Sequence, residues 1–213
     1  MRHILFDKKA SLNILFLGAH CDDIEIGAGG TLLKLIKEYS INHVTWIVFA
    51  STEIRKKEAL MSAERFLEDV PIKTVIINTF RDGFLPYQAV EIKEYFESLK
   101  KLFNPDLIFT HYHNDRHQDH RLISDLTWNT WREHFILEYE VPKYDGDLGQ
   151  PNFYVDLDAE ILSKRNSIIL ETYVSQNSKH WFDRDTFNAL PRLRGMESVA
   201  QFAEAFYARK VKL

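Results

Sequence analysis

Residues 12–23 of the chain read LNILFLGAHCDD, an apolar run that stops abruptly at a histidine, a cysteine and two aspartates. The run Leu12–Ala19 has the length and the continuous apolar character of a strand that is buried on both faces. A glycine-containing loop follows, and a helical pattern extends from about Gly29 to Tyr39. This stretch therefore predicts a strand–loop–helix unit with polar side chains where the strand ends.

The same alternation continues along the chain. Further apolar runs at His43–Ala50, Lys73–Asn78, Asp106–His111, Ile136–Val141 and Phe153–Leu157 predict strands. Helices are predicted at Lys56–Val70, Val90–Phe103, Asp119–Phe135, Asp158–Val174 and Glu197–Tyr207. Such alternation indicates right-handed crossovers and a mostly parallel sheet covered by helices on both faces. We predict a single Rossmann-like α/β domain over residues 1–213, with strand order about 3-2-1-4-5.

Composition excludes several classes of protein. The chain has 213 residues, of which 45% are hydrophobic and 27% charged, as in an ordinary globular protein. Its net charge of −4 gives no electrostatic reason to expect nucleic acid as a partner. The single cysteine, Cys21, excludes an intrachain disulfide and favours a reducing compartment. With no export signal and no apolar run near the roughly 20 residues of a membrane span, we expect a cytoplasmic protein without a transmembrane segment.

Two clusters of chemically active side chains follow predicted strands. The first, GAHCDDIE at 18–25, comes directly after the first strand, and the second, HYHNDRHQDH at 111–120, comes directly after the fourth. In a sheet of order 3-2-1-4, these two strands are neighbours where the winding reverses, and ligands bind outside their carboxyl ends. We therefore expect the two clusters to meet, although about a hundred residues separate them.

Histidine combined with carboxylate suits zinc or ferrous iron. A catalytic site needs three protein ligands and an open position, which His20, one of the two aspartates and one late histidine would supply. One of Asp22 and Asp23 would bind the metal, and the other would act as general base. Spacing alone leaves open which aspartate has which role. It also leaves open whether His117 and His120 both bind metal, and Asp119 could orient a neighbouring imidazole.

At these residues the chain resembles the LmbE-like, or PIG-L, N-acetylglucosaminyl deacetylases. The resemblance is carried by AHCDDIEIGAGG at 19–30 and DRHQDH at 115–120. It extends through R-x-x-E at 55–58, RDG at 81–83, YVSQ at 173–176, RLRG at 192–195 and AEAF at 203–206. Cys21 replaces the proline usual in this family, at a position that should not remove a ligand. Nearly the whole chain is covered.

The resemblance implies a reaction and a metal centre. The reaction is hydrolysis of the acetamido group of a 2-acetamido sugar, which releases acetate and a free amine. The implied cofactor is Zn²⁺ or another divalent ion such as Fe²⁺, and the implied ligands are His20, Asp23 and His120. Whether the sugar is free, nucleotide-linked or lipid-linked is left open, as is the existence of a homo-oligomer.

The resemblance also implies roles for residues around the metal. Asp22 becomes the general base. His117 becomes the residue that stabilises the oxyanion or protonates the leaving amine, and Asp119 supports it. Arg55 and Asp82 match positions that contact the sugar.

Two alternatives remain at the level of sequence. One is a metal-dependent amidase acting on another small N-acyl or amide conjugate, and the other is a carbohydrate- or nucleotide-binding module without catalysis. The intact Asp22, His117 and Asp119 argue against the second. The glycines at 27–30 lack the G-x-G-x-x-G spacing of a dinucleotide site, so we expect them to let a helix pack closely on the sheet. The roles of Cys21, His111 and His113 stay open.

Overall fold

A computed structural model describes residues 10–212, within which the strands form one seven-stranded sheet. Its order is β3-β2-β1-β4-β5-β7-β6, which contains the predicted order 3-2-1-4-5. Strands β1 to β5 are parallel, and β7 runs antiparallel to both β5 and β6. The strands are β1 (Ser11–His20), β2 (Ser40–Ala50), β3 (Ile72–Phe80), β4 (Leu107–His111), β5 (Phe135–Tyr139), β6 (Phe153–Leu157) and β7 (Phe202–Tyr207). The predicted α/β fold class is confirmed.

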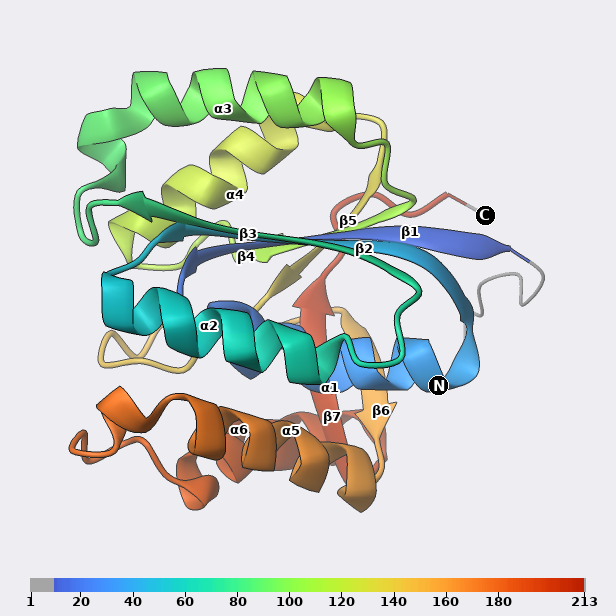
Figure 1. The fold of residues 1–213 in the computed structure, drawn as a ribbon. Coiled ribbons are helices and arrows are strands. Elements are labelled where there is room, and N and C mark those ends of the chain that lie inside the picture. The colour runs from blue at the N-terminus through green and yellow to red at the C-terminus, as the bar shows by residue number, and fades with distance from the viewer. Residues whose placement is uncertain (1–9, 213) are drawn as a thin grey trace.

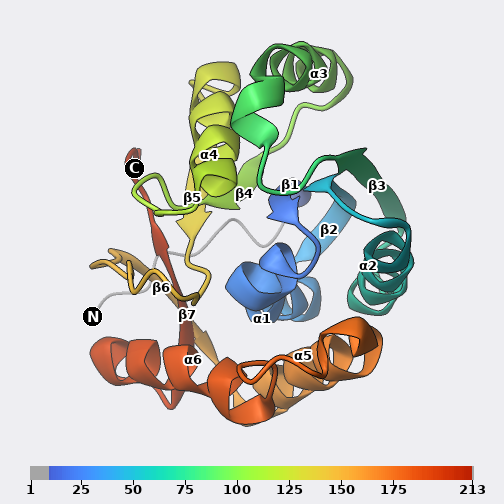
Figure 2. The ribbon, with the colours of Figure 1, turned by 90° about the vertical axis from the view of Figure 1, so that its left-hand side faces the viewer.

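Helices cover both faces of the sheet. Helices α3 and α4 lie on one face and α1 and α2 on the other, with α5 and α6 forming a further layer beyond α1 (Figures 1 and 2). The helices are α1 (Asp23–Glu38), α2 (Glu53–Phe66), α3 (Ala89–Leu102), α4 (Gln118–Thr130), α5 (Ala159–Thr172) and α6 (Arg184–Ser198), with short 3₁₀ turns η1 (Leu85–Gln88) and η2 (Val174–Gln176). None of the helices within residues 10–212 is both long and apolar enough to cross a bilayer.

The central strand β1 explains why its sequence is continuously apolar. Leu15 and Leu17 pack into the core on the α3–α4 side, and Phe16 between them packs into the core on the α1–α2 side. All three side chains are fully buried. Because both faces are covered, the usual alternation of polar and apolar residues is absent. The strand thereby delivers its polar last residue, His20, to the carboxyl edge of the sheet.

Helix α1 begins at Asp23, six residues before the predicted start at Gly29. Asp22 adopts a left-handed backbone conformation with φ 96°, which turns the chain from strand into helix without a longer loop. The glycines then lie inside the helix, where they allow close packing as expected. A Cβ atom on Gly27 would lie 2.3 Å from Cδ2 of Tyr139, so only glycine fits against this ring.

The predicted helix over Glu197–Tyr207 is wrong. Helix α6 ends at Ser198, and Phe202–Tyr207 forms strand β7 between β5 and β6. Pairing in the sheet overrides the helical propensity of the AEAF segment. Helix α6 itself was not located from the sequence, because Pro191 in its interior and Gly195 near its end both oppose a helix.

Candidate active site

The two polar clusters meet at the carboxyl ends of β1 and β4. These strands are hydrogen-bonded neighbours, with Phe16 opposite Phe109. His20 is the last residue of β1, and His120 lies in the first turn of α4. Their rings approach so closely that His20 Nδ1 lies 3.1 Å from His120 Nε2. The structure therefore brings together residues one hundred positions apart.

Asp23 completes a three-sided arrangement with these two imidazoles. Its Oδ2 lies 3.4 Å from His20 Nδ1, and its Oδ1 lies 3.6 Å from His120 Nε2. Bonds of 2.0–2.1 Å to a tetrahedral zinc ion place neighbouring ligand atoms about 3.3 Å apart. The side chains of Asp23 and His120 are each 4% exposed, and that of His20 is 18% exposed. These nitrogen and oxygen donors have the chemistry of zinc ligands, and each spacing, taken with one or the other oxygen of Asp23, is near the tetrahedral value.

Other groupings at the same place overlap with this one. Potential ligand atoms lie within 4.8 Å of one another in three sets of the described residues, which are His20–His117–His120, Asp23–His111–His120 and His20–Asp82–Asp119. The first two sets share His120 with the arrangement above, whereas the third lies at the opposite ring nitrogen of His20, Nε2, which faces Asp82 and Asp119. The Nε2 atom of His111 accepts the backbone N–H of Ala19 at 2.9 Å, which occupies its lone pair.

Each of the two imidazoles has a carboxylate on its far side. Nε2 of His20 lies 3.1 Å from Asp119 Oδ2, and Nδ1 of His120 lies 2.9 Å from Asp115 Oδ2. A carboxylate behind an imidazole fixes which ring nitrogen carries the proton and leaves the other free to bind a metal. This pairing leaves His20 Nδ1 and His120 Nε2 as the free nitrogens, and these are the two that face one another.

Asp119 was expected to support His117, but its carboxylate contacts His20 instead. The same carboxylate accepts the backbone N–H groups of Gly83 at 2.8 Å and Leu85 at 3.2 Å, which ties it to the segment after β3. Asp119 meets His117 through its own backbone, whose N–H donates to His117 Nδ1 at 3.2 Å. The difference arises because His117 is the N-cap of α4, so its ring turns back over the helix start.

Asp22 is held by an arginine. Its Oδ2 lies 2.7 Å from a terminal nitrogen of Arg55, which also donates to the backbone carbonyl of Cys21. Burial raises the pKa of Asp22 to about 6, and the charge of Arg55 opposes that rise only in part. Arg55 was expected to contact the sugar; in this structure its guanidinium is engaged with Asp22.

The segment 173–175, which follows α5, contacts Arg55 directly through Tyr173 and indirectly through Glu58. The guanidinium carbon of Arg55 lies 4.6 Å from the centre of the Tyr173 ring, and its other terminal nitrogen lies 3.3 Å from Glu58. Glu58 in turn accepts the backbone N–H and the hydroxyl of Ser175, both at 2.7 Å. The two motifs at 55–58 and 173–176 therefore form one contact network, although more than a hundred residues separate them in the sequence.

His117 and Asp82 lie at the rim of the site. The ring centre of His117 is 4.8 Å from that of His20 and 4.6 Å from that of His120. Burial and the neighbouring imidazoles lower the pKa of His117. Asp82 is 74% exposed, and its Oδ1 lies 3.1 Å from His20 Nε2. This hydrogen bond lowers the pKa of Asp82.

Three residues with open roles can now be placed. His111 is fully buried, and its Nε2 lies 3.2 Å from Asp23 Oδ2, so it belongs to the site. His113 is exposed and pairs with Asp125 at 3.2 Å. The Cys21 thiol is buried against the carbonyl of Ala50, and this burial raises its pKa.

Asp115 was not among the site residues predicted from the sequence. Its place two residues before His117 in DRHQDH was the signal that could have identified it.

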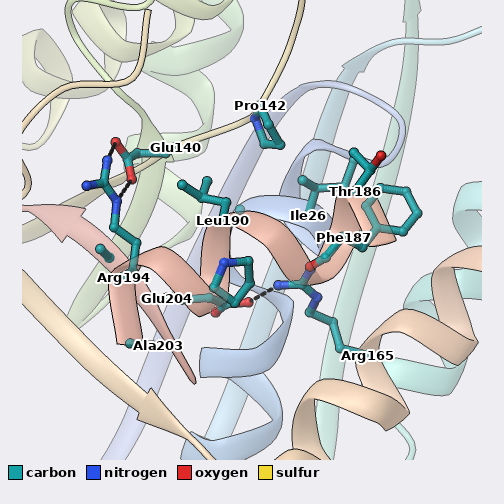
Figure 3. A pocket seen from close by; sticks show the side chains of 13 residues that line it. Ile26, Glu140, Pro142, Arg165, Thr186, Phe187, Leu190, Arg194, Ala203 and Glu204 are labelled. Atoms are coloured by element: carbon teal, nitrogen blue, oxygen red, sulfur yellow. Dashed lines mark hydrogen bonds and ion pairs between the residues drawn. The ribbon is translucent and has the colours of Figure 1, made fainter. Parts of the chain in front are cut away.

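A separate hollow lies between α1, α5, α6 and β7 (Figure 3). Two buried ion pairs stand in its wall. Arg165 binds Glu204 at 3.0 Å, and Arg194 binds Glu140 at 2.7 Å (Figure 3). None of its described lining residues belongs to the His–Asp cluster, so the hollow is distinct from the candidate metal centre.

Comparison with known proteins agrees with the geometry. The family model described as PIG-L, GlcNAc-PI de-N-acetylase, matches residues 15–131, which is more than half of the chain. The fold is similar to that of N,N'-diacetylchitobiose deacetylase from Pyrococcus horikoshii, with a TM-score of 0.74 and 21% identity over 95% of this chain and 87% of that one. It is also similar to teicoplanin deacetylase Orf2 in a zinc-inhibited form, with a TM-score of 0.70 and 14% identity over 92% and 97%.

The fold also occurs in a protein with another reaction. GalB, the 4-carboxy-2-hydroxymuconate hydratase of Pseudomonas putida KT2440, is similar with a TM-score of 0.70 and 13% identity over 95% of this chain and 98% of that one. Fold alone therefore does not select the reaction, and the site must be considered with it. The family match includes both clusters of the site, and on it the chain belongs to the PIG-L family of de-N-acetylases.

Proposed function

We propose that the protein is a metal-dependent hydrolase that removes the N-acetyl group from a 2-acetamido sugar or sugar conjugate. The observation that carries this proposal is the convergence of His20, Asp23 and His120, whose facing atoms lie 3.1–3.6 Å apart. The family match supports de-N-acetylation as the reaction. The substrate class is our inference from that family and from the deacetylase neighbours.

His20 Nδ1, Asp23 and His120 Nε2 would hold the ion, which we propose is Zn²⁺ or another divalent ion such as Fe²⁺. A zinc-type ion would lower the pKa of water to about 7 and polarise the amide carbonyl. An amide is a poor electrophile, so both effects are needed. Asp119 would keep the imidazole of His20 in the tautomer that ligation requires.

Asp22 would accept the proton of the attacking water. Its pKa, raised to about 6 by burial, suits a base that works near neutral pH. Arg55 holds one of its oxygens at 2.7 Å and so fixes the direction of the carboxylate. His117 stands beside both ligand imidazoles and would donate to the oxyanion or to the leaving nitrogen.

Arg55 and Asp82 would contact the sugar. Asp82 is exposed at the rim and already reaches the ring of His20, so a substrate held by it would lie next to the metal. Arg55 is 17% exposed and would have to share its donors between Asp22 and the substrate. We also propose that the whole chain acts as one functional unit, because Tyr173 and Ser175 lie beyond the family match and still support Arg55.

The test is acetate release from a panel of substrates by the metal-reconstituted protein. The panel contains free N-acetylated sugars, nucleotide-linked and lipid-linked acetamido sugars, and simple N-acyl amines. We expect turnover of one or more acetamido sugars and none by the metal-free protein. Asp22→Asn tests the base, and Asp69→Asn, at an exposed position far from the site, is the matched control.

Two results would overturn the proposal. One is full activity after verified removal of the metal, and the other is wild-type activity of Asp22→Asn. Turnover confined to non-sugar amides would instead keep the metal-dependent reaction and replace the substrate class.

A further inference from the structure

Asp115 lies in the loop between β4 and α4, on the side of the His120 ring that faces away from His20. It is 2% exposed. Its Oδ2 lies 2.9 Å from His120 Nδ1, and its Oδ1 accepts the backbone N–H of His117 at 2.7 Å. Each oxygen of this carboxylate is thus directed at a residue of the site.

Lys143 holds Asp115 from a different part of the chain, the segment that follows β5. Its Nζ donates to Asp115 Oδ2 at 2.8 Å and to Asp147 Oδ1 at 2.8 Å. Asp147 also accepts the backbone N–H of Arg116 at 2.6 Å. The segment 141–147 is therefore fastened to the loop that carries Asp115 by two side chains.

This arrangement has a specific consequence for His120. A neutral imidazole carries one proton, and an ionised carboxylate can only accept a hydrogen bond. The carboxylate at Nδ1 therefore fixes the proton there and leaves the lone pair on Nε2, the atom that faces His20 and Asp23. A buried carboxylate needs a compensating cation, and the ammonium of Lys143 is in contact with it.

We propose that Asp115 and Lys143 are positioning residues of the metal centre. Asp115 sets the Nδ1–H tautomer of His120, and Lys143 holds the Asp115 carboxylate in the orientation that does so. The inference rests on the proposed function, because it takes His120 as a metal ligand.

The experiment measures the zinc affinity of the full chain by competition with a chromophoric chelator, without substrate. We expect Asp115→Ala to weaken zinc binding by about 10–100-fold, the usual effect of removing such a partner. Asp115→Asn should recover part of this loss, because its amide oxygen can still accept from Nδ1. Lys143→Met should weaken binding less than Asp115→Ala and should add nothing in the double variant, since both act through the same carboxylate. Lys73→Met, which removes a lysine–glutamate pair far from the site, should leave the affinity unchanged.

A second measurement reads the tautomer directly. In ¹⁵N-correlated NMR spectra of the metal-free wild type, His120 should carry its proton on Nδ1. In Asp115→Ala it should populate both tautomers. If Asp115→Ala does not fold, the wild-type spectrum and the zinc affinity of Lys143→Met still test the inference. An Nε2–H tautomer of His120 in the wild type overturns it.

His120→Ala separates failure of this inference from failure of the proposed function. If His120→Ala loses zinc while Asp115→Ala and Lys143→Met bind it like the wild type, the positioning role is wrong and the metal centre stands. If His120→Ala binds zinc like the wild type, the metal centre itself is misplaced, and both proposals fall.

Discussion

Two groups of charged side chains lie against helix α1 but differ in how their charges are compensated. Glu204 of one group accepts hydrogen bonds from the backbone of α1, and Asp23 of the other is the first residue of this helix. The ion-pair cluster consists of Glu140, Arg165, Arg194 and Glu204, around the hollow of Figure 3. The site cluster consists of His20, Asp22, Asp23, Asp115, Asp119 and His120, at the carboxyl ends of β1 and β4. In the first, every carboxylate meets a guanidinium. In the second, carboxylates and imidazoles face one another.

The difference teaches which buried charges point to a ligand. Arg165 and Glu204 compensate one another, and Glu204 also accepts the backbone N–H groups of Gly30 and Thr31 in α1. The site cluster holds four carboxylates, whereas the cations in contact with them are Arg55 and Lys143. An excess of buried carboxylate is costly unless a cation neutralises it. A divalent ion would provide that charge.

The largest effect is expected at Asp22, the proposed general base in the site cluster. Asp22→Asn removes the proton acceptor and keeps the size of the side chain, so kcat should fall by about 10²–10⁴-fold. The melting temperature should change little. Acetate release at saturating substrate measures this, and a kcat within twofold of the wild type would contradict the assigned base.

The ion-pair cluster should respond in the opposite way, through stability. Arg165→Met leaves Glu204 as a buried charge without its partner, which should lower the free energy of unfolding by about 3–5 kcal/mol. Activity per folded molecule should be unchanged. Arg65→Met, which breaks an exposed arginine–glutamate pair with Glu171, should cost less than about 1 kcal/mol. Urea titration of both variants measures the contrast, and equal losses would remove the distinction that we draw.

Bound metal should stabilise the folded protein, and it should do so through the site cluster and not through the ion-pair cluster. Zinc at one hundred times its dissociation constant should raise the free energy of unfolding by about 2.7 kcal/mol. Thermal melts with and without zinc measure this shift. The shift should persist in Arg65→Met and vanish in His120→Ala. A shift of wild-type size in His120→Ala would place the metal elsewhere.

The smallest effect is expected at Gly27, which lines the hollow and packs on Tyr139. Gly27→Ala gains up to about 1 kcal/mol in helix propensity. The new methyl group would overlap the Tyr139 ring, and overpacking of this kind costs about 1–3 kcal/mol. We expect a net loss of roughly 1 kcal/mol in urea titration. A gain in stability would show that α1 can move away from Tyr139.

Much of the fold follows from the sequence because the central parallel strands β1 and β4 are buried on both faces. The apolar run at Phe153–Leu157 matches β6 at both ends, and the order of the first five strands follows from the strand–helix alternation. The C-terminal part was harder. The segment Phe202–Tyr207 becomes a strand only because β5 and β6 lie on either side of it. Helix α6 could not be recognised because Pro191, which disfavours a helix, lies in its interior.

The candidate site also has a part that the sequence predicts and a part that it does not. The meeting of the two clusters could be predicted, because it depends on strand order. The partners of individual side chains could not, because they depend on reach and ring orientation. Asp119 illustrates this: its sequence neighbour is His117, but its carboxylate meets His20 across the sheet edge. Lys143 carries no sequence signal, since its importance arises from the distant Asp115.

The left-handed backbone at Asp22 determines how this position can be examined by mutagenesis. At φ 96° most side chains strain the backbone, whereas asparagine and aspartate tolerate such conformations better than other residues. An alanine scan would therefore disturb the corner between strand and helix and displace His20 and Asp23 together with it. The amide replacement preserves that corner, so at this position a conservative exchange separates chemistry from architecture and a truncation does not.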